Sequence, residues 1–392
     1  MEEIHSRLAL LKQANLLRTT KEIVKKKLNA IEIDGVAYLN FCSNDYLGLS
    51  GHKGALEAAK QALDDFGAGA TASRLICGTT SLHVATERLL ARLKKREAAL
   101  LFPTGYMANL ALFTAITTPK DAIVIDRLAH ASIVDAVKLS AARLLVFEHN
   151  SPADLDRILT KYRGRYDNLY VATEAVFSMD GDIAPLPELI SVCEKHKARL
   201  IIDEAHSTGV LGKTGKGIEE YYASTEGSPI IMGTCSKALG VQGGFICSSQ
   251  ELIDYMVSTA RPFIYTTGIA PALCGAIAAN IEFLFANALY IDQYHKKLKF
   301  FRKLIKALDI PVSHSESAIF PLVIGDTGKA LAFAECLKEN HILALAIREP
   351  TVPPNTARIR IAINAAHTCE EIEFLAKTLV TVCKKYTIAS VQ

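Results

Sequence analysis

The sequence predicts an α/β protein with a mostly parallel sheet between helices, followed by a smaller α+β domain. Three observations support this fold class. Short apolar runs recur through the middle of the chain without polar–apolar alternation, helical segments separate them, and the pattern changes near residue 286. Strands covered on both faces read as continuous apolar runs. We therefore expect an N-terminal segment over 1–50, a large domain over 51–285 and a small domain over 286–392.

The N-terminal segment opens with MEEIHSRLALLKQANLL, which has two acidic residues at its start and an amphipathic pattern. This pattern predicts a helix and argues against a signal peptide. The stretch YLNFCSNDYLGL then predicts a short strand and a turn.

The large domain contains six apolar runs that are strand candidates, and helical stretches such as 186–197 supply the crossovers between them. The six runs cover residues 98–102, 122–126, 143–147, 168–173, 199–203 and 230–234.

A long helical pattern leads into the small domain. It runs from Gly268 towards Leu308 and is broken or bent near Asn287. The elements expected after it are strands in AIFPLVIGD and ARIRIAIN, a helix at about 329–340, and a last helix that Thr368 and Glu371 open as a capping box.

Composition excludes several classes of protein. The chain has 392 residues, half of them apolar, and a formal net charge of +3, which is too mild for a nucleic-acid or anionic-membrane footprint. No apolar run is long enough to span a bilayer. The nine cysteines form no C-x-x-C pair, which favours reduced thiols in the cytoplasm over a disulfide framework or a metal site.

Polar residues follow the strand candidates where ligands of open parallel sheets bind, outside the carboxyl ends of the strands. Gly105 and Tyr106 lie in a turn after the first run that leads into a helix, MANLALFTAI, and the free N–H groups of a helix N-terminus suit a phosphate. The other polar residues at this edge are His130, Ser178, Asp180, Asp203, Glu204, His206 and Lys237.

Lys237 and Asp203 point to one cofactor. Lys237 lies in GTCSKALGVQGGFI between apolar flanks, so we expect it to be buried. Asp203 ends an apolar strand, where an unpaired carboxylate is costly, so it should face a cation. Pyridoxal 5'-phosphate (PLP) needs both groups, because a lysine binds its aldehyde as a Schiff base and an acid holds its protonated ring nitrogen.

Each of these residues has a simpler interpretation when taken alone: Lys237 in a surface turn, His130 as a structural histidine, Asp203 as a loop cap. Their co-occurrence at one sheet edge favours the cofactor site. Two stretches, 207–214 (STGVLGKT) and 212–217 (GKTGKG), imitate phosphate-binding loops without matching their spacing, and both are expected to form a surface loop.

Four stretches together resemble the α-oxoamine synthases, a family of fold type I PLP-dependent transferases. They are TEAVFSMDGDIAPL, DEAHSTGVLG, TCSKALGVQGGF and AIREPTVPPNTARIRIAINAAHT, and the similarity runs nearly end to end. The resemblance implies a mostly parallel seven-stranded sheet, with PLP bound by Lys237 and its ring nitrogen paired with Asp203.

The resemblance also implies roles for other residues. His130 is expected to stack on the cofactor ring, with Ser178 and His206 near the ring hydroxyl. The phosphate is expected at Gly105, Tyr106 and Thr234, with Thr266 supplied by the neighbouring subunit of a homodimer. Glu174 and Asn44 lie at the active site in the family pattern, and Arg18 and Thr351 match substrate contacts.

Arg360 is placed by strand alternation as well as by resemblance. In ARIRIAIN the isoleucines share one strand face, which leaves Arg358 and Arg360 on the other, where an arginine can hold a carboxylate by a bidentate pair. The chain departs from the family at Cys235, Glu349 and Lys216, where leucine, proline and arginine are usual.

The implied reaction is the decarboxylative condensation of L-alanine with a pimeloyl thioester, carried by CoA or an acyl carrier protein, in biotin synthesis. A sister activity that joins glycine to acetyl-CoA uses the same residues. Two other classes are a non-catalytic subunit, which would be expected to lose Lys237, and a nucleotide-binding protein that uses the Gly-Lys-Thr stretch.

Overall fold

The computed structural model describes residues 2–224 and 228–388 and divides into two compact units. Unit 1 comprises Met1–Asn44, Met179–Gly181 and Gln293–Gln392, and unit 2 comprises Asp45–Ser178 and Asp182–Asp292. Residues 1–44 of the expected N-terminal segment (1–50) fall in unit 1 together with the C-terminal part of the chain, and residues 45–50 fall in unit 2.

The centre of unit 2 is a seven-stranded sheet in the order β4-β10-β9-β8-β7-β5-β6. Its strands are β4 (Ala98–Phe102), β5 (Ala122–Asp126), β6 (Arg143–Phe147), β7 (Leu169–Glu174), β8 (Arg199–Asp203), β9 (Ile230–Thr234) and β10 (Gly244–Ser248). All neighbours pair in parallel except β10, which is antiparallel to β4 and β9. The six predicted strands are confirmed, and β10 is the strand that the sequence pattern missed.

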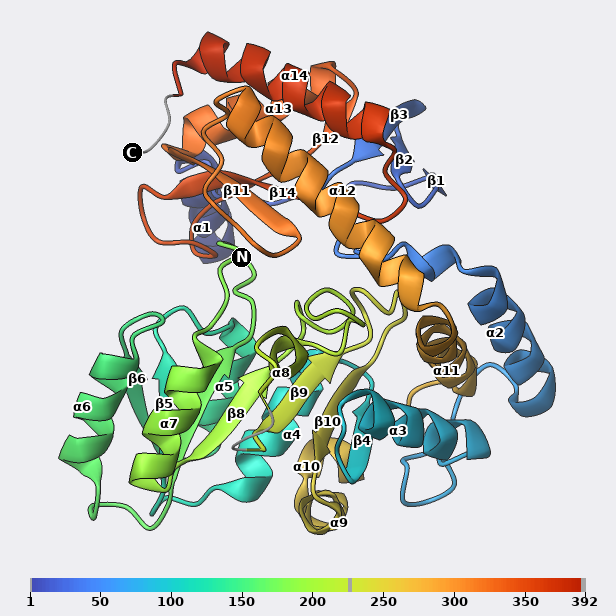
Figure 1. Cartoon of the computed structure of the whole chain (residues 1–392), viewed down its shortest axis with the longest axis vertical. Helices are drawn as coiled ribbons and strands as arrows, with labels where there is room; N and C mark the ends of the chain where they lie inside the picture. Colours follow the sequence, from blue (N-terminus) through green and yellow to red (C-terminus); the bar gives the residue numbers. More distant parts are fainter. Residues whose placement is uncertain (1, 225–227, 389–392) are drawn as a thin grey trace. The chain divides into compact units, whose positions relative to one another are not determined.

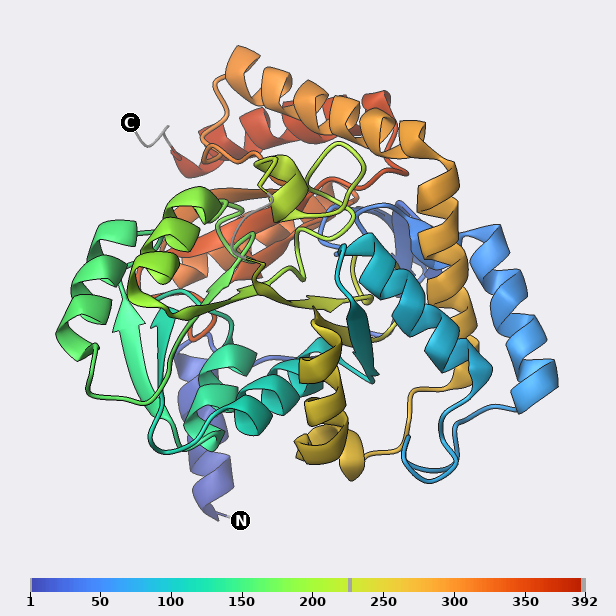
Figure 2. The ribbon, with the colours of Figure 1, turned by 60° about the horizontal axis from the view of Figure 1, so that its bottom comes forward.

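Burial along the strands explains the continuous apolar runs. Every residue of β4, β5, β7, β9 and β10 is buried, whereas the edge strand β6 has two exposed residues and one of intermediate burial. Figure 2 shows α4, α5 and α9 on one face of the sheet and α6 and α7 on the other. The core on the α4 side includes Phe102, Phe113 and Ile123.

The helices of unit 2 connect and cover these strands (Figure 1). They are α2 (Lys53–Phe66), α3 (Ser81–Leu93), α4 (Gly105–Ile116), α5 (Ala131–Leu139), α6 (Pro152–Tyr162), α7 (Leu186–His196), α8 (Ile218–Tyr221), α9 (Gln250–Thr259), α10 (Arg261–Ile264), α11 (Pro271–Ala286) and the 3-10 turn η1 (Leu49–Gly51). The apolar helix α11 packs between α2 and α3.

Unit 1 contains two small sheets, β1-β2-β3-β12 and the antiparallel β11-β14-β13. Its elements are α1 (Glu2–Gln13), β1 (Lys25–Lys26), β2 (Ala30–Ile33), β3 (Val36–Asn40), β11 (Ile319–Gly325), α13 (Thr327–Glu339), β12 (Ile342–Leu343), β13 (Leu345–Ile347), β14 (Ala357–Ala362) and α14 (Cys369–Tyr386). The expected capping box of Thr368 and Glu371 is present at the start of α14.

The predicted break near Asn287 is also present. Helix α12 (Ala288–Ala307) follows α11 after Asn287, and the two helices meet at an angle of 85°. Among the described residues, no single helix is long and apolar enough to cross a membrane, and only the bent pair α11 and α12 reaches that length together.

Candidate active site

Strand register in unit 2 brings the predicted polar residues to one edge of the sheet. Glu174 at the end of β7 pairs with Asp203 at the end of β8, and Asp203 pairs with Met232 of β9. Lys237 follows β9 by three residues. The parallel strands therefore deliver Glu174, Asp203 and the Lys237 segment side by side, as expected for ligand sites of open sheets.

Lys237 contacts a histidine rather than a carboxylate. Its Nζ lies 2.7 Å from Nε2 of His206, and Nδ1 of His206 lies 2.7 Å from the hydroxyl of Tyr46. His206 is buried and Tyr46 is fully buried, whereas Lys237 is only half-buried. The apolar flanks predicted a buried lysine, and that expectation is wrong because Lys237 is only partly covered by the surrounding chain.

Asp203 lies at the end of a chain of hydrogen bonds that the sequence did not reveal. Asn109 on α4 donates to Asp203 Oδ2 (3.2 Å) and to Ser132 Oγ (2.9 Å), and Ser132 Oγ lies 2.8 Å from Nδ1 of His130. The backbone N–H of Ala205 donates to Asp203 Oδ1 (2.9 Å). A buried asparagine in the apolar stretch MANLALFTAI is the sequence signal that could have identified Asn109.

Electrostatics link His130 and Glu174 to the same charges. Loss of hydration lowers the pKa of His130, and the charge of Asp203 opposes this shift while that of Lys237 adds to it. Burial raises the pKa of Glu174 well above its usual value, and the neighbouring charge of Asp203 raises it further. Within the described part of the chain, Glu174 Oε1 is buried without a hydrogen-bond partner.

The start of α4 lies against the ends of β9 and β10. Thr104 caps the helix by accepting from the Met107 N–H (3.2 Å). A Cβ on Gly244 would lie 2.4 Å from the Thr104 carbonyl oxygen, so only glycine allows this approach. The side chain of Thr234 lies beside Gly105, since a Cβ added to this glycine would lie 3.4 Å from the Cβ of Thr234. The first turn of α4 offers backbone N–H groups that have no helical partner.

Tyr106 and Thr266 lie at partly open positions of unit 2. Tyr106 is 43% exposed, and its hydroxyl donates to Asp135, which raises the pKa of Tyr106. Thr266 is half-buried, and its neighbour Thr267 forms a bridge with Ser73.

Ser178 is half-buried and lies at the start of a short loop. At the other end of this loop, Asp182 contacts His149, which also contacts Asp126. His149 Nδ1 lies 2.9 Å from Asp126 Oδ1, and Nε2 lies 2.7 Å from Asp182 Oδ2. Burial disfavours the charged ring, but the two carboxylates outweigh burial and raise the pKa of His149 to about 10. The ring also meets Phe177 edge-on, with centroids 4.4 Å apart.

The remaining predicted residues belong to unit 1. Arg18 donates to Thr351 Oγ1 (3.1 Å) and to the Glu349 carbonyl (3.2 Å), so the structure brings Arg18 and Thr351 together. Arg360 is buried on β14, and Asn44 is half-buried at the end of the N-terminal segment. On the same strand Arg358 pairs with Asp180.

Arg348 is a candidate that the sequence did not reveal. It lines a cavity of about 570 Å³ in unit 1, together with Lys12, Arg18 and Lys21. Burial and the neighbouring charge of Arg18 lower the pKa of Arg348, and among the described residues its Nε is buried without a partner. Two guanidinium groups in one cavity favour an anionic ligand.

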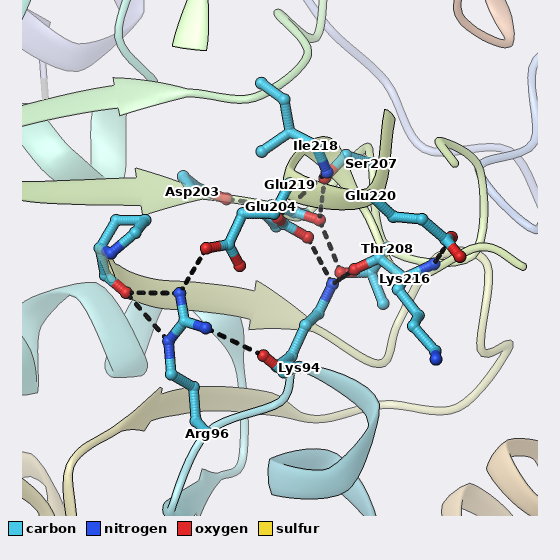
Figure 3. A network of polar contacts seen from close by, with 12 residues as sticks. Lys94, Arg96, Asp203, Glu204, Ser207, Thr208, Lys216, Ile218, Glu219 and Glu220 are labelled. Atoms are coloured by element: carbon cyan, nitrogen blue, oxygen red, sulfur yellow. Dashed lines mark hydrogen bonds and ion pairs between the residues drawn. The ribbon is translucent and has the colours of Figure 1, made fainter. Parts of the chain in front are cut away.

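The loop that imitates phosphate-binding motifs is already occupied by a carboxylate. Glu220 accepts hydrogen bonds from the Thr214 N–H (2.9 Å), the Thr214 hydroxyl (2.7 Å) and the Lys216 N–H (3.1 Å), in part visible in Figure 3. These are the amide groups that a phosphate would need. Most of the loop is buried, so the expectation of a surface loop is wrong.

Comparison with known proteins agrees with this geometry. The family model for aminotransferase class I and II matches residues 36–379. The chain belongs to this family. Within it, the 8-amino-7-oxononanoate synthase of Treponema denticola is 37% identical over 98% of this chain and 96% of its own length, and that of Marinobacter nauticus is 41% identical over 94% and 93%.

Solved structures of the family share the fold. A serine palmitoyltransferase from S. paucimobilis, solved with a bound PLP–myriocin aldimine, has a TM-score of 0.93 at 26% identity and covers 98% of both chains. The 8-amino-7-oxononanoate synthase of Francisella tularensis has a TM-score of 0.76 at 28% identity, covering 90% of this chain and 99% of its own. The predicted fold type I transferase and the resemblance to α-oxoamine synthases are confirmed.

The residues of unit 2 fit PLP. The amine of the half-buried Lys237 lies beside His206, and the buried carboxylate of Asp203 receives neutral donors from Asn109 and Ala205. The unpaired Glu174 Oε1 is an acceptor facing this charge cluster. The first turn of α4 supplies N–H groups for a phosphate.

Proposed function

We propose that this protein is a PLP-dependent acyltransferase that condenses L-alanine with a pimeloyl thioester. The products are 8-amino-7-oxononanoate, carbon dioxide and the free thiol, and the reaction is a step of biotin synthesis. The observation that supports this best is the full-length similarity to 8-amino-7-oxononanoate synthases, combined with a half-buried lysine and a buried aspartate at one sheet edge.

Lys237 and His206 form the proton-transfer pair of the proposed mechanism. When bound, PLP supplies an electron-withdrawing ring that stabilises negative charge on the amino acid's Cα. Lys237 would hold the cofactor through its Nζ, and the same amine would take up the Cα proton of alanine. His206, 2.7 Å from Nζ, orients this amine, and Tyr46 orients His206.

Asp203 keeps the cofactor's ring nitrogen protonated. Its burial strengthens a hydrogen bond to a cation, because little water competes for the carboxylate. Asn109 fixes the carboxylate through Oδ2. His130 is proposed to stack on the ring and to donate to the acyl carbonyl oxygen, and its lowered pKa favours a neutral ring that can stack without added charge.

Binding of the other cofactor groups is assigned by position and family resemblance. Gly105, Tyr106 and Thr234 are proposed to hold the phosphate at the start of α4. Ser178 is proposed to contact the ring hydroxyl. Glu174 is proposed as a further cofactor contact, which its unpaired Oε1 supports.

Substrate binding is assigned to residues of unit 1. Arg360 and Asn44 are proposed to contact the amino acid, with Arg360 holding its carboxylate. Arg18 and Thr351, already 3.1 Å apart, are proposed to contact the acyl substrate. Arg348 adds a second guanidinium to that cavity, which suits the terminal carboxylate of a pimeloyl chain.

We further propose a homodimer in which the partner subunit's Thr266 completes the phosphate site. Large apolar side chains near this position are exposed, with Ile76 at 79% and Tyr265 at 71%. The bridge between Ser73 and Thr267 joins their two segments into one surface.

A cytoplasmic location is proposed as well, because all nine cysteines are free thiols.

The proposed activity is tested by two measurements. Borohydride reduction of the purified protein should fix the cofactor to Lys237, and Lys237→Ala should lose both this link and turnover. Thiol release with four combinations, L-alanine or glycine with pimeloyl-CoA or acetyl-CoA, should be fastest for L-alanine with pimeloyl-CoA. A preference for glycine with acetyl-CoA would reject the biotin assignment and retain the cofactor chemistry.

A further inference from the structure

A buried ion pair next to the end of β8 has no place in the proposed mechanism. Lys94, which directly follows α3 as its C-cap, contacts Glu204, the residue after Asp203, through Nζ and Oε2. Each side chain is only 1% exposed. Figure 3 shows the two residues within one polar network. Taking two charges out of water is costly, and apolar side chains would often stabilise the fold equally well. The pair is therefore a candidate for a functional role.

Glu204 is the pivot of the turn that carries His206. Its backbone N–H donates to the Met232 carbonyl (2.7 Å). Its carbonyl accepts from the N–H groups of Ser207 (3.2 Å) and Thr208 (3.0 Å). Adjacent residues of an extended chain point to opposite sides, which is why Asp203 can face the cofactor site while Glu204 faces Lys94. Any displacement of Glu204 thus moves His206.

The same carboxylate holds the end of the loop that follows the turn. The Ile218 N–H donates to Glu204 Oε1 (3.2 Å), and Lys94 Nζ donates to the Lys216 carbonyl (2.8 Å). Between them, Gly217 has φ +111°, and a Cβ there would lie 1.9 Å from Glu204 Oε2. The pair therefore joins helix α3, the turn and the end of the loop at one point.

We propose that Lys94 is a positioning residue that acts through Glu204. By anchoring the 204–208 turn, it sets the contact between His206 and the amine of Lys237. Without the ammonium group, Glu204 and the Lys216 carbonyl lose their connection to the end of α3, so the turn is no longer held in place, whether or not Glu204 is charged. In the single variant, the carboxylate of Glu204 is in addition left buried with one neutral donor, which costs stability. This inference rests on the proposed function, because the contact matters only if Lys237 reacts.

The test uses two variants of the full-length protein loaded with PLP. Lys94→Met should lower kcat about 10- to 100-fold while KM for L-alanine changes little, since misplacement of a reacting group by about 1 Å has effects of this size. The pH midpoint of the absorbance change of the bound cofactor should also shift. Lys94→Met/Glu204→Gln removes the buried charge, so its thermal midpoint should return close to that of the wild type.

The double variant separates positioning from stability. If Lys94 positions His206, the double variant melts near the wild type but keeps the shifted absorbance midpoint and the lowered kcat. If the double variant has the wild-type pH midpoint of the absorbance change and the wild-type kcat, the pair is only structural and the inference is wrong. This comparison holds even if Lys94→Met alone does not fold.

Arg96→Met is the matched control. Arg96 follows the same helix and donates to Glu219 (2.8 Å) and to the Pro229 carbonyl (3.0 Å), with a side chain 11% exposed. Arg96→Met should lower the thermal midpoint without shifting the pH midpoint of the absorbance change. A shift equal to that of Lys94→Met would contradict a specific role for Lys94.

If the wild type itself shows no borohydride-reducible cofactor, the proposed function fails instead. In cofactor-free protein, a changed rate of Lys237 labelling by an amine reagent in Lys94→Met is a further expected difference.

Discussion

The contacts of His149 with Asp126 and Asp182 lead to a quantitative prediction about stability. His149→Gln removes a cation that hydrogen-bonds two carboxylates, Asp126 with a side chain 0% exposed and Asp182 with one 33% exposed. A glutamine can donate to one of them but carries no charge. The buried Asp126 would then lose its only charged partner among the contacts of the described chain, while its bonds from Leu128 and Asn150 N–H groups remain.

The size of the effect follows from the pKa of His149, which rises from 6.5 to about 10. This shift corresponds to at most about 5 kcal/mol of stability. The share of Asp182 is reduced because its side chain is a third exposed and screened by solvent. We therefore expect His149→Gln to lower the apparent free energy of unfolding by about 3 kcal/mol near pH 6, and the melting midpoint of this 392-residue chain by roughly 4 °C.

The pH dependence has a definite sign. Because the pKa is higher in the folded state, the stabilisation is fully present below pH 6.5 and is lost progressively as the pH rises towards about 10. The assay is urea unfolding of wild type and His149→Gln at pH 6, 8 and 10, with His314→Gln at an exposed histidine as control. A difference between wild type and His149→Gln that stays constant from pH 6 to pH 10 would refute the reasoning.

Three further outcomes are expected. Asp203→Asn should keep the fold and the cofactor link but lower kcat at least about 100-fold, because an amide cannot keep the ring nitrogen protonated; turnover near that of the wild type in the same assay would exclude this role. Gly217→Ala should destabilise the protein by more than about 1 kcal/mol in urea unfolding, since its φ is +111° and a Cβ would meet Glu204 Oε2 at 1.9 Å. Arg348→Ala should raise KM for pimeloyl-CoA far more than KM for L-alanine, and an unchanged KM for the thioester would remove Arg348 from the acyl site.

Much of the fold could be predicted from the sequence because burial on both faces leaves a direct pattern. β4, β5, β7 and β9 are fully buried and read as continuous apolar runs, so their positions were predicted within a residue or two. β10 was missed because it is short and begins at Gly244, within the glycine-rich end of the lysine segment, so the whole stretch was interpreted as part of the cofactor site. Its antiparallel direction depends on pairing with β4, about 140 residues away in the chain, which local pattern does not encode.

The chemical types of the site residues were also determined by the sequence, because parallel strands expose their carboxyl ends at one edge. Lys237, Asp203 and His206 could be named without coordinates. The hydrogen bonds that connect these residues to the rest of the structure could not be predicted. The contacts from Asn109 to Asp203 and from Tyr46 to His206 join residues 94 and 160 positions apart. Such contacts depend on which helix packs over which strand.

Only the tertiary structure decided the burial of polar groups. The loop at 207–217 looks like a surface loop by composition, yet Glu220 accepts hydrogen bonds from its amides and Glu204 accepts one from Ile218, the residue that follows it. Lys94 lies between a leucine and a second lysine and looks like an ordinary surface residue, but it pairs with a carboxylate 110 positions away. A lysine side chain is the same in both settings, and only the arrangement of distant segments determines whether water or a buried carboxylate meets its ammonium group.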